Sequence, residues 1–337
     1  MNEPRIRTPR VREHVGERIA IAGWVLALRR MGKMAFVVVR DGWGTVQVVA
    51  SKRSLAPLEE AQAGPESVIR VVGRVVANPA APGGVELVEP EFEVQVAVTE
   101  PLPVELTKQL RTARLPDQLD HAPTVLREPS RRAIFELSAG VMAGFRRTLG
   151  ARGFTEIQTP KLVGAATESG ANVFAIDYFG RPAYLAQSPQ LYKQIMVGVF
   201  ERVFEVGPVF RAEPHATVRH LAEYVSLDVE LGFIEDHLDV VAVLEAVLAG
   251  IVEELWNNHE AAVQRLELSR PAVPVPLPRI DFAQARRRLA EAGVGPREAD
   301  DLAPAEERWL GAWAQAEHGS DWLVVTGYPM AKRPFYT

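Results

Sequence analysis

The stretch from Val203 to Phe233 reads VFEVGPVFRAEPHATVRHLAEYVSLDVELGF and predicts two strands that flank a polar loop. Side chains alternate along the second strand, so that one face is apolar and the other carries an aromatic ring, a hydroxyl and two carboxylates. The apolar set is Val225, Leu227, Val229 and Leu231, and the polar set is Tyr224, Ser226, Asp228 and Glu230. Such a sheet suits a polar, charged substrate, and a hairpin with one solvated face is the alternative.

Three features of this stretch together resemble motif 2 of the class II aminoacyl-tRNA synthetases. They are FRAE at residues 210–213, the pair Arg219-His220, and YVSLDVE at residues 224–230. Within that class the pattern is most similar to the archaeal-type aspartyl-tRNA synthetases. The resemblance implies an α+β fold, with an N-terminal OB-fold β-barrel followed by a class II antiparallel β-sheet flanked by helices.

Composition sets the broad class of the chain. Its 337 residues, 47% of them apolar, are enough for a substantial core and about two domains. Cysteine is absent, which excludes a disulfide framework and thiolate chemistry. The N-terminus has no apolar run, and the most apolar helical stretch, residues 238–255, carries four acidic residues. We therefore expect a soluble, cytoplasmic protein with no membrane partner.

Charge is unevenly distributed along the chain. The formal net charge is −5, but residues 1–53 contain 11 Lys and Arg against 4 Asp and Glu, or +7, leaving −12 for the remainder. A basic N-terminal module on an acidic body fits a local contact with a polyanion.

Five β-branched runs with turn signals between them follow the N-terminus. They occupy residues 19–30, 34–41, 44–51, 67–77 and 85–96, and predict a small OB-type barrel. The pattern GWV…F…RDG.G.VQVV resembles the anticodon-binding domain of this synthetase group. The resemblance implies that Phe36 stacks on a tRNA base, Gln47 reads a base edge and Arg29 contacts a phosphate or base. An inward-facing core role is the alternative for Phe36.

The remaining chain divides into a hinge and a second domain. We predict an anticodon-binding domain at residues 1–100, a Pro-rich linker at 101–129 and an incomplete catalytic domain at 130–337. Ser130 is predicted to cap a helix that ends near Gly150, and FTEIQTPKLV at 154–163 is predicted to form a strand stopped at Pro160. This unit resembles class II motif 1, which implies a homodimer.

Two further segments bear on the substrate. In the loop TESGANVF at 167–174, the resemblance implies that Glu168 faces the α-ammonium group of an amino acid. In YLAQSPQLYKQ at 184–194, Ser188 is predicted to cap a helix whose Gln190 and Lys193 share one face. A lysine there suits a side-chain carboxylate, so aspartate is the favoured amino acid.

The resemblance also assigns the nucleotide site. Arg211 is the catalytic candidate, because its guanidinium can contact both the α-phosphate and the substrate carboxylate. Asp228 is placed at the substrate ammonium. The expected ATP-binding residues are Arg211, Ala212, Glu213, Arg219, His220, Leu221 and Tyr224.

In the family, a magnesium-binding carboxylate, a clamp arginine and the glycine-rich motif 3 follow a Pro-Phe-Tyr segment, which here is at residues 334–336. We therefore expect a C-terminally truncated catalytic domain with no metal ligand of its own, the main Mg²⁺ carboxylate lying beyond Thr337. The predicted function is ATP-dependent aspartate–tRNA ligation, with tRNA(Asn) left open as a second acceptor. The alternatives are a tRNA-binding protein without turnover and an aspartate-activating paralogue that does not charge tRNA.

Overall fold

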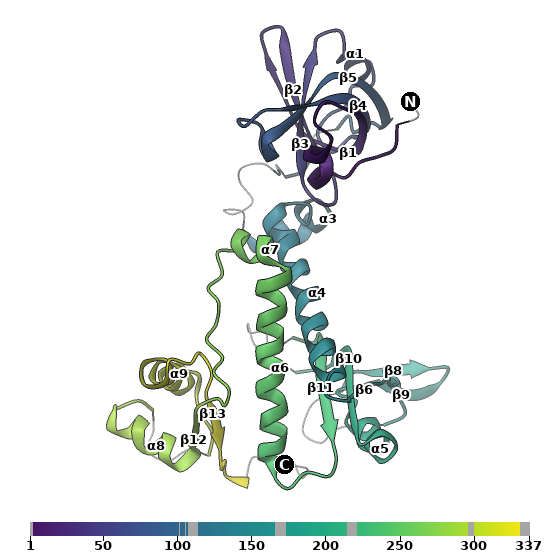
Figure 1. Cartoon of the computed structure of the whole chain (residues 1–337). Coiled ribbons are helices and arrows are strands. Elements are labelled where there is room, and N and C mark those ends of the chain that lie inside the picture. Colours follow the sequence, from purple (N-terminus) through teal and green to yellow (C-terminus); the bar gives the residue numbers. More distant parts are fainter. Residues whose placement is uncertain are drawn as a thin grey trace. The chain divides into compact units, whose positions relative to one another are not determined.

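The computed structural model describes residues 3–100, 102–104, 106, 114–165, 173–213, 221–295 and 300–330. The chain splits into two compact units, Met1–Arg132 and Ala133–Thr337 (Figure 1). Within the described ranges, no helix is both long enough and apolar enough to span a bilayer.

The first unit is a closed five-stranded barrel with strand order β1-β2-β3-β5-β4. The strands are β1 (Arg18–Met31), β2 (Met34–Arg40), β3 (Thr45–Ser51), β4 (Val68–Ala77) and β5 (Val85–Val96). All neighbouring strands are antiparallel except β3 and β5. Valine, isoleucine and leucine side chains at every second position fill the interior, as alternation requires, and the predicted OB-fold barrel is confirmed.

Short helices surround the barrel. A 3₁₀ helix, η1 (Thr8–His14), precedes β1, and α1 (Ala56–Glu60) and η2 (Pro82–Gly84) lie in the connections between strands. After the barrel, α2 (Leu115–Asp120) and α3 (Ala122–Val125) lie within residues 101–129, the segment predicted to be a Pro-rich linker.

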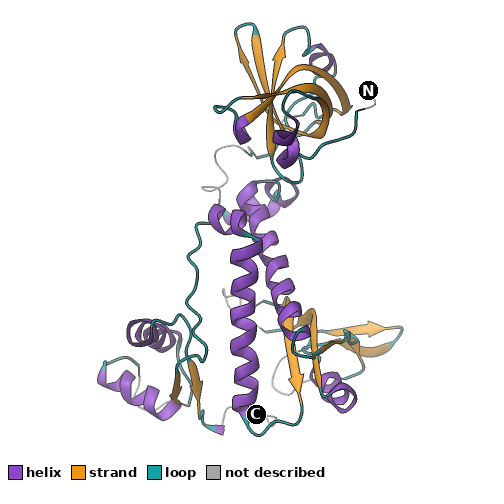
Figure 2. Cartoon of the chain, in the orientation of Figure 1, coloured by secondary structure: helices purple, strands orange, loops and turns teal. Residues whose placement is uncertain are grey.

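In the described residues, the second unit combines several helices with three small sheets (Figure 2). The helices are α4 (Pro129–Gly150), α5 (Gln190–Phe200), α6 (His237–Asn258), α7 (Glu260–Arg265), α8 (Phe282–Glu291) and α9 (Pro304–His318). The sheets are β11-β10-β6, β7-β9-β8 and the parallel pair β12-β13. Their strands are β6 (Thr155–Glu156), β7 (Leu162–Val163), β8 (Ala175–Tyr178), β9 (Arg181–Leu185), β10 (Arg202–Phe210), β11 (Glu223–Leu231), β12 (Arg279–Asp281) and β13 (Val324–Thr326).

Helices α4 and α6 pack closely against each other (Figure 1). A Cβ at Gly144 would lie 2.9 Å from the Cα of Ile251, so the backbones approach at a distance that only glycine permits. Phe145 and Leu149 of α4 join Phe204 and Val206 of β10 in one apolar cluster. Helices α4 and α6 thus cover one face of the β10–β11 sheet. The opposite face is left to other segments of the chain.

One local prediction was wrong, and another was only partly right. Ser130 does not cap α4, because the helix begins at Pro129 and the carboxylate of Glu128 accepts from the backbone amides of Ser130 and Arg131, at 2.9 and 3.0 Å. The strand predicted to stop at Pro160 does end before that proline but is only two residues long, at β6, and pairing resumes as β7 beyond Pro160. Proline lacks the amide that a continuous ladder needs, so it separates two short strands that belong to different sheets.

Candidate functional site

The β10–β11 hairpin presents one apolar and one polar face. Its register pairs Glu205 with Asp228, Gly207 with Ser226 and Val209 with Tyr224. Residues that face each other directly in an antiparallel pair point to the same side, so all of these side chains share a face. The opposite face carries Phe204, Val206, Leu227 and Val229, which belong to the apolar cluster beneath α4.

Helix α5 brings an amine and an amide to the polar face. The Nζ atom of Lys193 lies 3.1 Å from Oδ1 of Asp228 and 3.5 Å from Oε2 of Glu230. The amide Nε2 of Gln190 donates to the same Glu230 carboxylate at 3.2 Å. Lys193 is only 5% exposed. A buried ammonium shared by two carboxylates is a charged group held in a fixed place on this face.

The turn before α5 positions this helix. The hydroxyl of Ser188 accepts from the backbone amide of Gln190 at 3.2 Å, and Ser188 and its neighbour Gln187 are both buried. The helix begins at Gln190 with Pro189 as its N-cap residue, one position later than a Ser188 cap predicts. The Ser188 hydroxyl nevertheless satisfies one of the backbone donors that the helix start leaves open.

A second ion pair on this face was missed from the sequence. The carboxylate of Glu205, 1% exposed, accepts from the amide of Thr159 at 3.1 Å and its hydroxyl at 2.7 Å, and pairs with Nζ of Lys161 at 2.8 Å. A Cβ at Gly207 would lie 3.5 Å from that Nζ, so the lysine amine lies over the glycine on the polar face. The alternation within β10 places Glu205 on the polar face, but nothing in the local pattern predicts its partner.

Arg211 continues β10 toward the loop. Its backbone amide donates to the carbonyl of Ala222 at 2.9 Å, which extends the ladder by one residue pair. Alternation then places Arg211 on the same face as Val209 and Glu205, and its guanidinium carbon lies 6.0 Å from the ring centre of Tyr224. The structure thus gathers Gln190, Lys193, Arg211, Tyr224 and Asp228 over one face of a single sheet.

The other predicted residues of this region either flank the β10–β11 hairpin or lie outside the described residues. Ala212 and Glu213 follow Arg211 and are half-buried, and Leu221 is 63% exposed just before β11. Glu168, Arg219 and His220 lie outside the described residues. Across the described ranges, no three carboxylates or imidazoles come close enough together to hold a metal ion.

The barrel holds the predicted base-reading residues on its outer surface. Register pairs Arg29 with Phe36 across β1 and β2, and Val38 with Gln47 across β2 and β3. Phe36 alternates with the buried Ala35 and Val37, so it points outward and is not a core residue. The amide of Gln47 donates to Glu86 at 2.9 Å. One outer face therefore carries the cation, the ring and the amide together.

Comparison with known proteins agrees with both halves of this architecture. Residues 118–337 match a family described as class II tRNA synthetases (D, K and N), and residues 19–99 match an OB-fold nucleic acid binding domain. An aspartate–tRNA(Asp/Asn) ligase of Deinococcus radiodurans is 47% identical over 332 residues, covering 98% of this chain and 75% of that protein. The ligase of the same name from Thermus thermophilus is 46% identical over 327 residues, covering 97% and 76%.

Solved structures show the same likeness. The asparaginyl-tRNA synthetase of Pyrococcus horikoshii complexed with asparaginyl-adenylate has a TM-score of 0.89 and 31% identity, covering 98% of this chain and 76% of its own. A barrel of the OB type joined to this sheet is the architecture of a class II aminoacyl-tRNA synthetase. The chain belongs to the class II tRNA synthetase family that comprises the D, K and N members, and the resemblance inferred from motif 2 is confirmed.

Proposed function

We propose that this protein is an aspartate–tRNA ligase, which activates L-aspartate with ATP and transfers the aspartyl group to tRNA. The observation that carries the proposal is the buried amine of Lys193, 3.1 Å from Asp228 and beside Gln190 on the polar face of the sheet. We assign activation to residues 130–337 and tRNA recognition to residues 1–100. The aspartate–tRNA(Asp/Asn) relatives at 46–47% identity support this assignment.

Aspartate carries one ammonium and two carboxylates, and the face offers a matching group for each. Lys193 would pair with the side-chain carboxylate, with Gln190 as a neutral donor beside it. Asp228 would accept from the α-ammonium group, and Glu168 and Ser188 complete the proposed amino-acid site. Asparagine has no negative side chain, so it would leave the Lys193 amine without a counter-charge from the substrate. This difference is the proposed basis of selection.

In the activation step, an α-carboxylate oxygen of aspartate bonds to the α-phosphorus of ATP, and the bond to pyrophosphate breaks. Both reactants are anionic, so the site must neutralise the charge that develops at phosphorus. Arg211 is the proposed catalytic residue for this role. Tyr224 would stack on the adenine ring, and the remaining proposed ATP contacts are Ala212, Glu213, Arg219, His220 and Leu221. Mg²⁺ accompanies ATP in such chemistry, but the described residues form no dedicated metal site and no step here depends on one.

Two partners follow from the proposal. The outward ring of Phe36, with Arg29 and Gln47, would bind the anticodon by stacking and by hydrogen bonds to base edges. A second copy of the chain is proposed to pack on α4, where Ile134 is 47% exposed and Phe135 is 60% exposed. Large apolar side chains exposed on a helix are typical of an interface between subunits.

Aspartate-dependent exchange between ATP and pyrophosphate tests the activation step, and charging of tRNA(Asp) and tRNA(Asn) tests the transfer. We expect aspartate, and not asparagine, to support exchange. Binding of tRNA without exchange would favour a tRNA-binding protein, and exchange without charging would favour an aspartate-activating paralogue. Either result would refute the ligase assignment.

The Lys193→Met variant tests the role of the amine. We expect it to lower kcat/KM for aspartate roughly 10- to 150-fold, the value of a lost charge-assisted hydrogen bond of about 1.5–3 kcal/mol. Gln194→Met is the matched control, because Gln194 is the next residue of α5 and its side chain is exposed. An unchanged kcat/KM in a folded Lys193→Met protein would contradict the assignment.

A further inference from the structure

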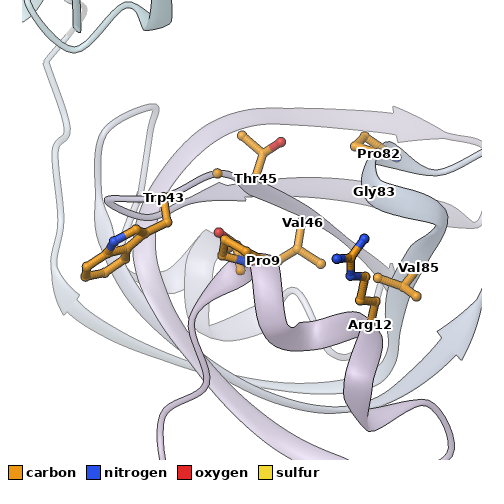
Figure 3. A pocket seen from close by; sticks show the side chains of 10 residues that line it. Pro9, Arg12, Trp43, Thr45, Val46, Pro82, Gly83 and Val85 are labelled. Atoms are coloured by element: carbon orange, nitrogen blue, oxygen red, sulfur yellow. The ribbon is translucent and has the colours of Figure 1, made fainter. Parts of the chain in front are cut away.

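The barrel contains a hollow of about 310 Å³ between η1, the β2–β3 loop and the loop before β5 (Figure 3). Asp41, 2% exposed, joins two of its walls by accepting hydrogen bonds from Thr8, Trp43 and Gly44. Trp43 and Pro82 lie at opposite ends of the hollow, so they do not form one surface for a ligand. The polar face of the β10–β11 sheet, in contrast, has a charged group that the proposed function leaves unused.

Lys161 brings a second ammonium group to this polar face. Its Nζ atom lies 2.8 Å from Oε1 of Glu205 and donates to the hydroxyl of Thr159 at 3.0 Å. A Cβ added at Gly207 would lie 3.4 Å from Cε and 3.5 Å from Nζ of the lysine. The end of the lysine therefore lies directly over a residue that has no side chain, and glycine makes room for a cation in the middle of the face.

Hydrogen bonds fix Lys161 at both ends. Its backbone carbonyl accepts from the amide of Ala186 at 3.0 Å, and the carbonyl of Ala186 accepts from the amide of Phe210 on β10 at 3.0 Å. Its ammonium is held by the buried carboxylate of Glu205, which also accepts from the amide and hydroxyl of Thr159. The amine is therefore preorganised, so a ligand that binds it pays little of the entropic cost of ordering a lysine side chain.

One donor of this ammonium remains for a ligand. A lysine ammonium has three donors and no acceptor. Among the described residues, Glu205 and Thr159 take two donors of Lys161, whereas the amine of Lys193 has three acceptors on β11. The side chain of Lys161 is 21% exposed and that of Glu205 only 1%. The cation is therefore the member of the ion pair that a ligand can reach.

The amine lies between the two ends of the proposed site. Glu205 lies directly opposite Asp228, and Gly207 is one step of two residues further along β10, a distance of roughly 7 Å. Arg211 is two more such steps beyond Gly207, or roughly 13 Å. An aspartate molecule whose ammonium group contacts Asp228 extends over about one step. Its α-carboxylate therefore comes to Lys161, over Gly207, before it comes to Arg211.

We propose that Lys161 is a further catalytic residue of the activation step, whose ammonium binds the α-carboxylate of aspartate. Its third donor holds one carboxylate oxygen while the other oxygen bonds to the α-phosphorus and the bond to pyrophosphate breaks. The lysine keeps its proton, and its positive charge offsets the repulsion between the carboxylate and the phosphates of ATP. The inference rests on the proposed function, since it takes aspartate and ATP as the substrates.

Binding of two ligands to the full chain, measured by isothermal titration calorimetry, tests this contact. L-aspartate has both carboxylates, whereas its α-amide keeps the ammonium group and the side-chain carboxylate but has a neutral group in place of the α-carboxylate. We expect Lys161→Met to weaken the binding of aspartate roughly 10- to 150-fold, as for a lost charge-assisted hydrogen bond. The α-amide should lose at most about threefold, because it offers this ammonium no negative charge. Lys193→Met should weaken both ligands, since both keep the side-chain carboxylate.

Two further variants control for charge and for folding. Lys52→Met is the matched control, because Lys52 is an exposed lysine of the barrel, and it should bind both ligands as the native protein does. Lys161→Met leaves the buried carboxylate of Glu205 without its counter-charge, so the double variant Lys161→Met/Glu205→Gln removes both charges together. The double variant should show the same difference between the two ligands. Circular dichroism and thermal unfolding check that each variant is folded.

The remaining outcomes separate this inference from the function on which it rests. Equal weakening of both ligands in Lys161→Met and in the double variant would mean that the lysine only supports the structure, and the contact would be refuted. Affinities equal to those of Lys52→Met would refute it as well. In both cases, weaker binding of both ligands by Lys193→Met would leave the proposed aspartate site standing. If the native chain binds neither ligand, the proposed function fails and this inference fails with it.

Discussion

Replacing Glu205 with glutamine should destabilise the second unit by about 2–4 kcal/mol. Glu205 is 1% exposed and accepts from the amide and hydroxyl of Thr159 while pairing with Lys161 at 2.8 Å. Glutamine keeps one acceptor oxygen but turns an NH₂ group toward those donors and leaves the lysine amine without its counter-charge. Removing one partner of a fully buried pair costs about 3–5 kcal/mol. The Lys161 side chain is 21% exposed, so water recovers part of that cost.

The matched control is Glu156→Gln on the neighbouring strand β6. Its carboxylate pairs with Arg146 at 3.0 Å, but the two side chains are 34% and 42% exposed. An exposed pair of this kind contributes about 0.2–1 kcal/mol. The same chemical change should therefore cost several times more at residue 205 than at residue 156.

Hydrogen exchange of the β10 amides is the most direct assay, because it reports the opening free energy of this strand in a chain that has two units. Urea unfolding monitored in parallel gives the global value. Equal losses of unfolding free energy for Glu205→Gln and Glu156→Gln would refute the reasoning. Burial would then not decide how much an ion pair contributes to the stability of this sheet. A loss below about 1 kcal/mol at Glu205 would refute it as well.

Three further predictions concern the two units separately. Gly144→Ala should destabilise the second unit by about 1–3 kcal/mol, because its Cβ would meet Ile251 at 2.9 Å, whereas Gly198→Ala, with no atom within 4 Å, should stabilise it by about 0.5–1 kcal/mol. Thermal unfolding measures both, and effects of the same sign would contradict the packing. Burial raises the pKa of Asp41, but hydrogen bonds from Thr8, Trp43 and Gly44 outweigh it, so the pKa is lowered from its ordinary value of 3.8. The carboxylate therefore stabilises the barrel above about pH 4 and loses that contribution as the pH falls through its folded-state pKa. The stability difference between the native protein and Asp41→Asn, measured by urea unfolding, should be constant near neutral pH and shrink below pH 3.8, and a difference that grows in acid would show that the sign is wrong. A dimer that forms through α4 should dissociate when Phe135, 60% exposed, is replaced by aspartate, which analytical ultracentrifugation measures, and an unchanged mass would place the interface elsewhere.

Much of the fold was predictable because it depends on local periodicity. The five runs of the barrel and the alternation at residues 224–231 became β1–β5 and the two faces of β11. The family could also be inferred, because its motifs are contiguous stretches of sequence. The cap at Ser130 was wrong because the helix begins one residue earlier, at Pro129, and the carboxylate of Glu128 accepts from the amides of Ser130 and Arg131 in its first turn.

The candidate site was only partly predictable. The helix spacing of Gln190 and Lys193 placed both on one face of a helix, but it did not place that helix over the sheet. Glu205 was overlooked because its partners, Thr159 and Lys161, lie on either side of Pro160 in a segment with no regular period. The contact between Thr8 and Asp41 could not be predicted either, because the two residues lie 33 positions apart in segments that no pattern connects.

The sequence by itself determined which side of each strand a residue faces and which family the chain resembles, because both are encoded in neighbouring residues. Only the tertiary structure decided which charges meet. Lys193 reaches Asp228 across 35 positions and Thr159 reaches Glu205 across 46, because helix packing and sheet register bring these segments together. The interaction free energy of such pairs depends on burial and distance, and neither quantity is defined until the chain has folded.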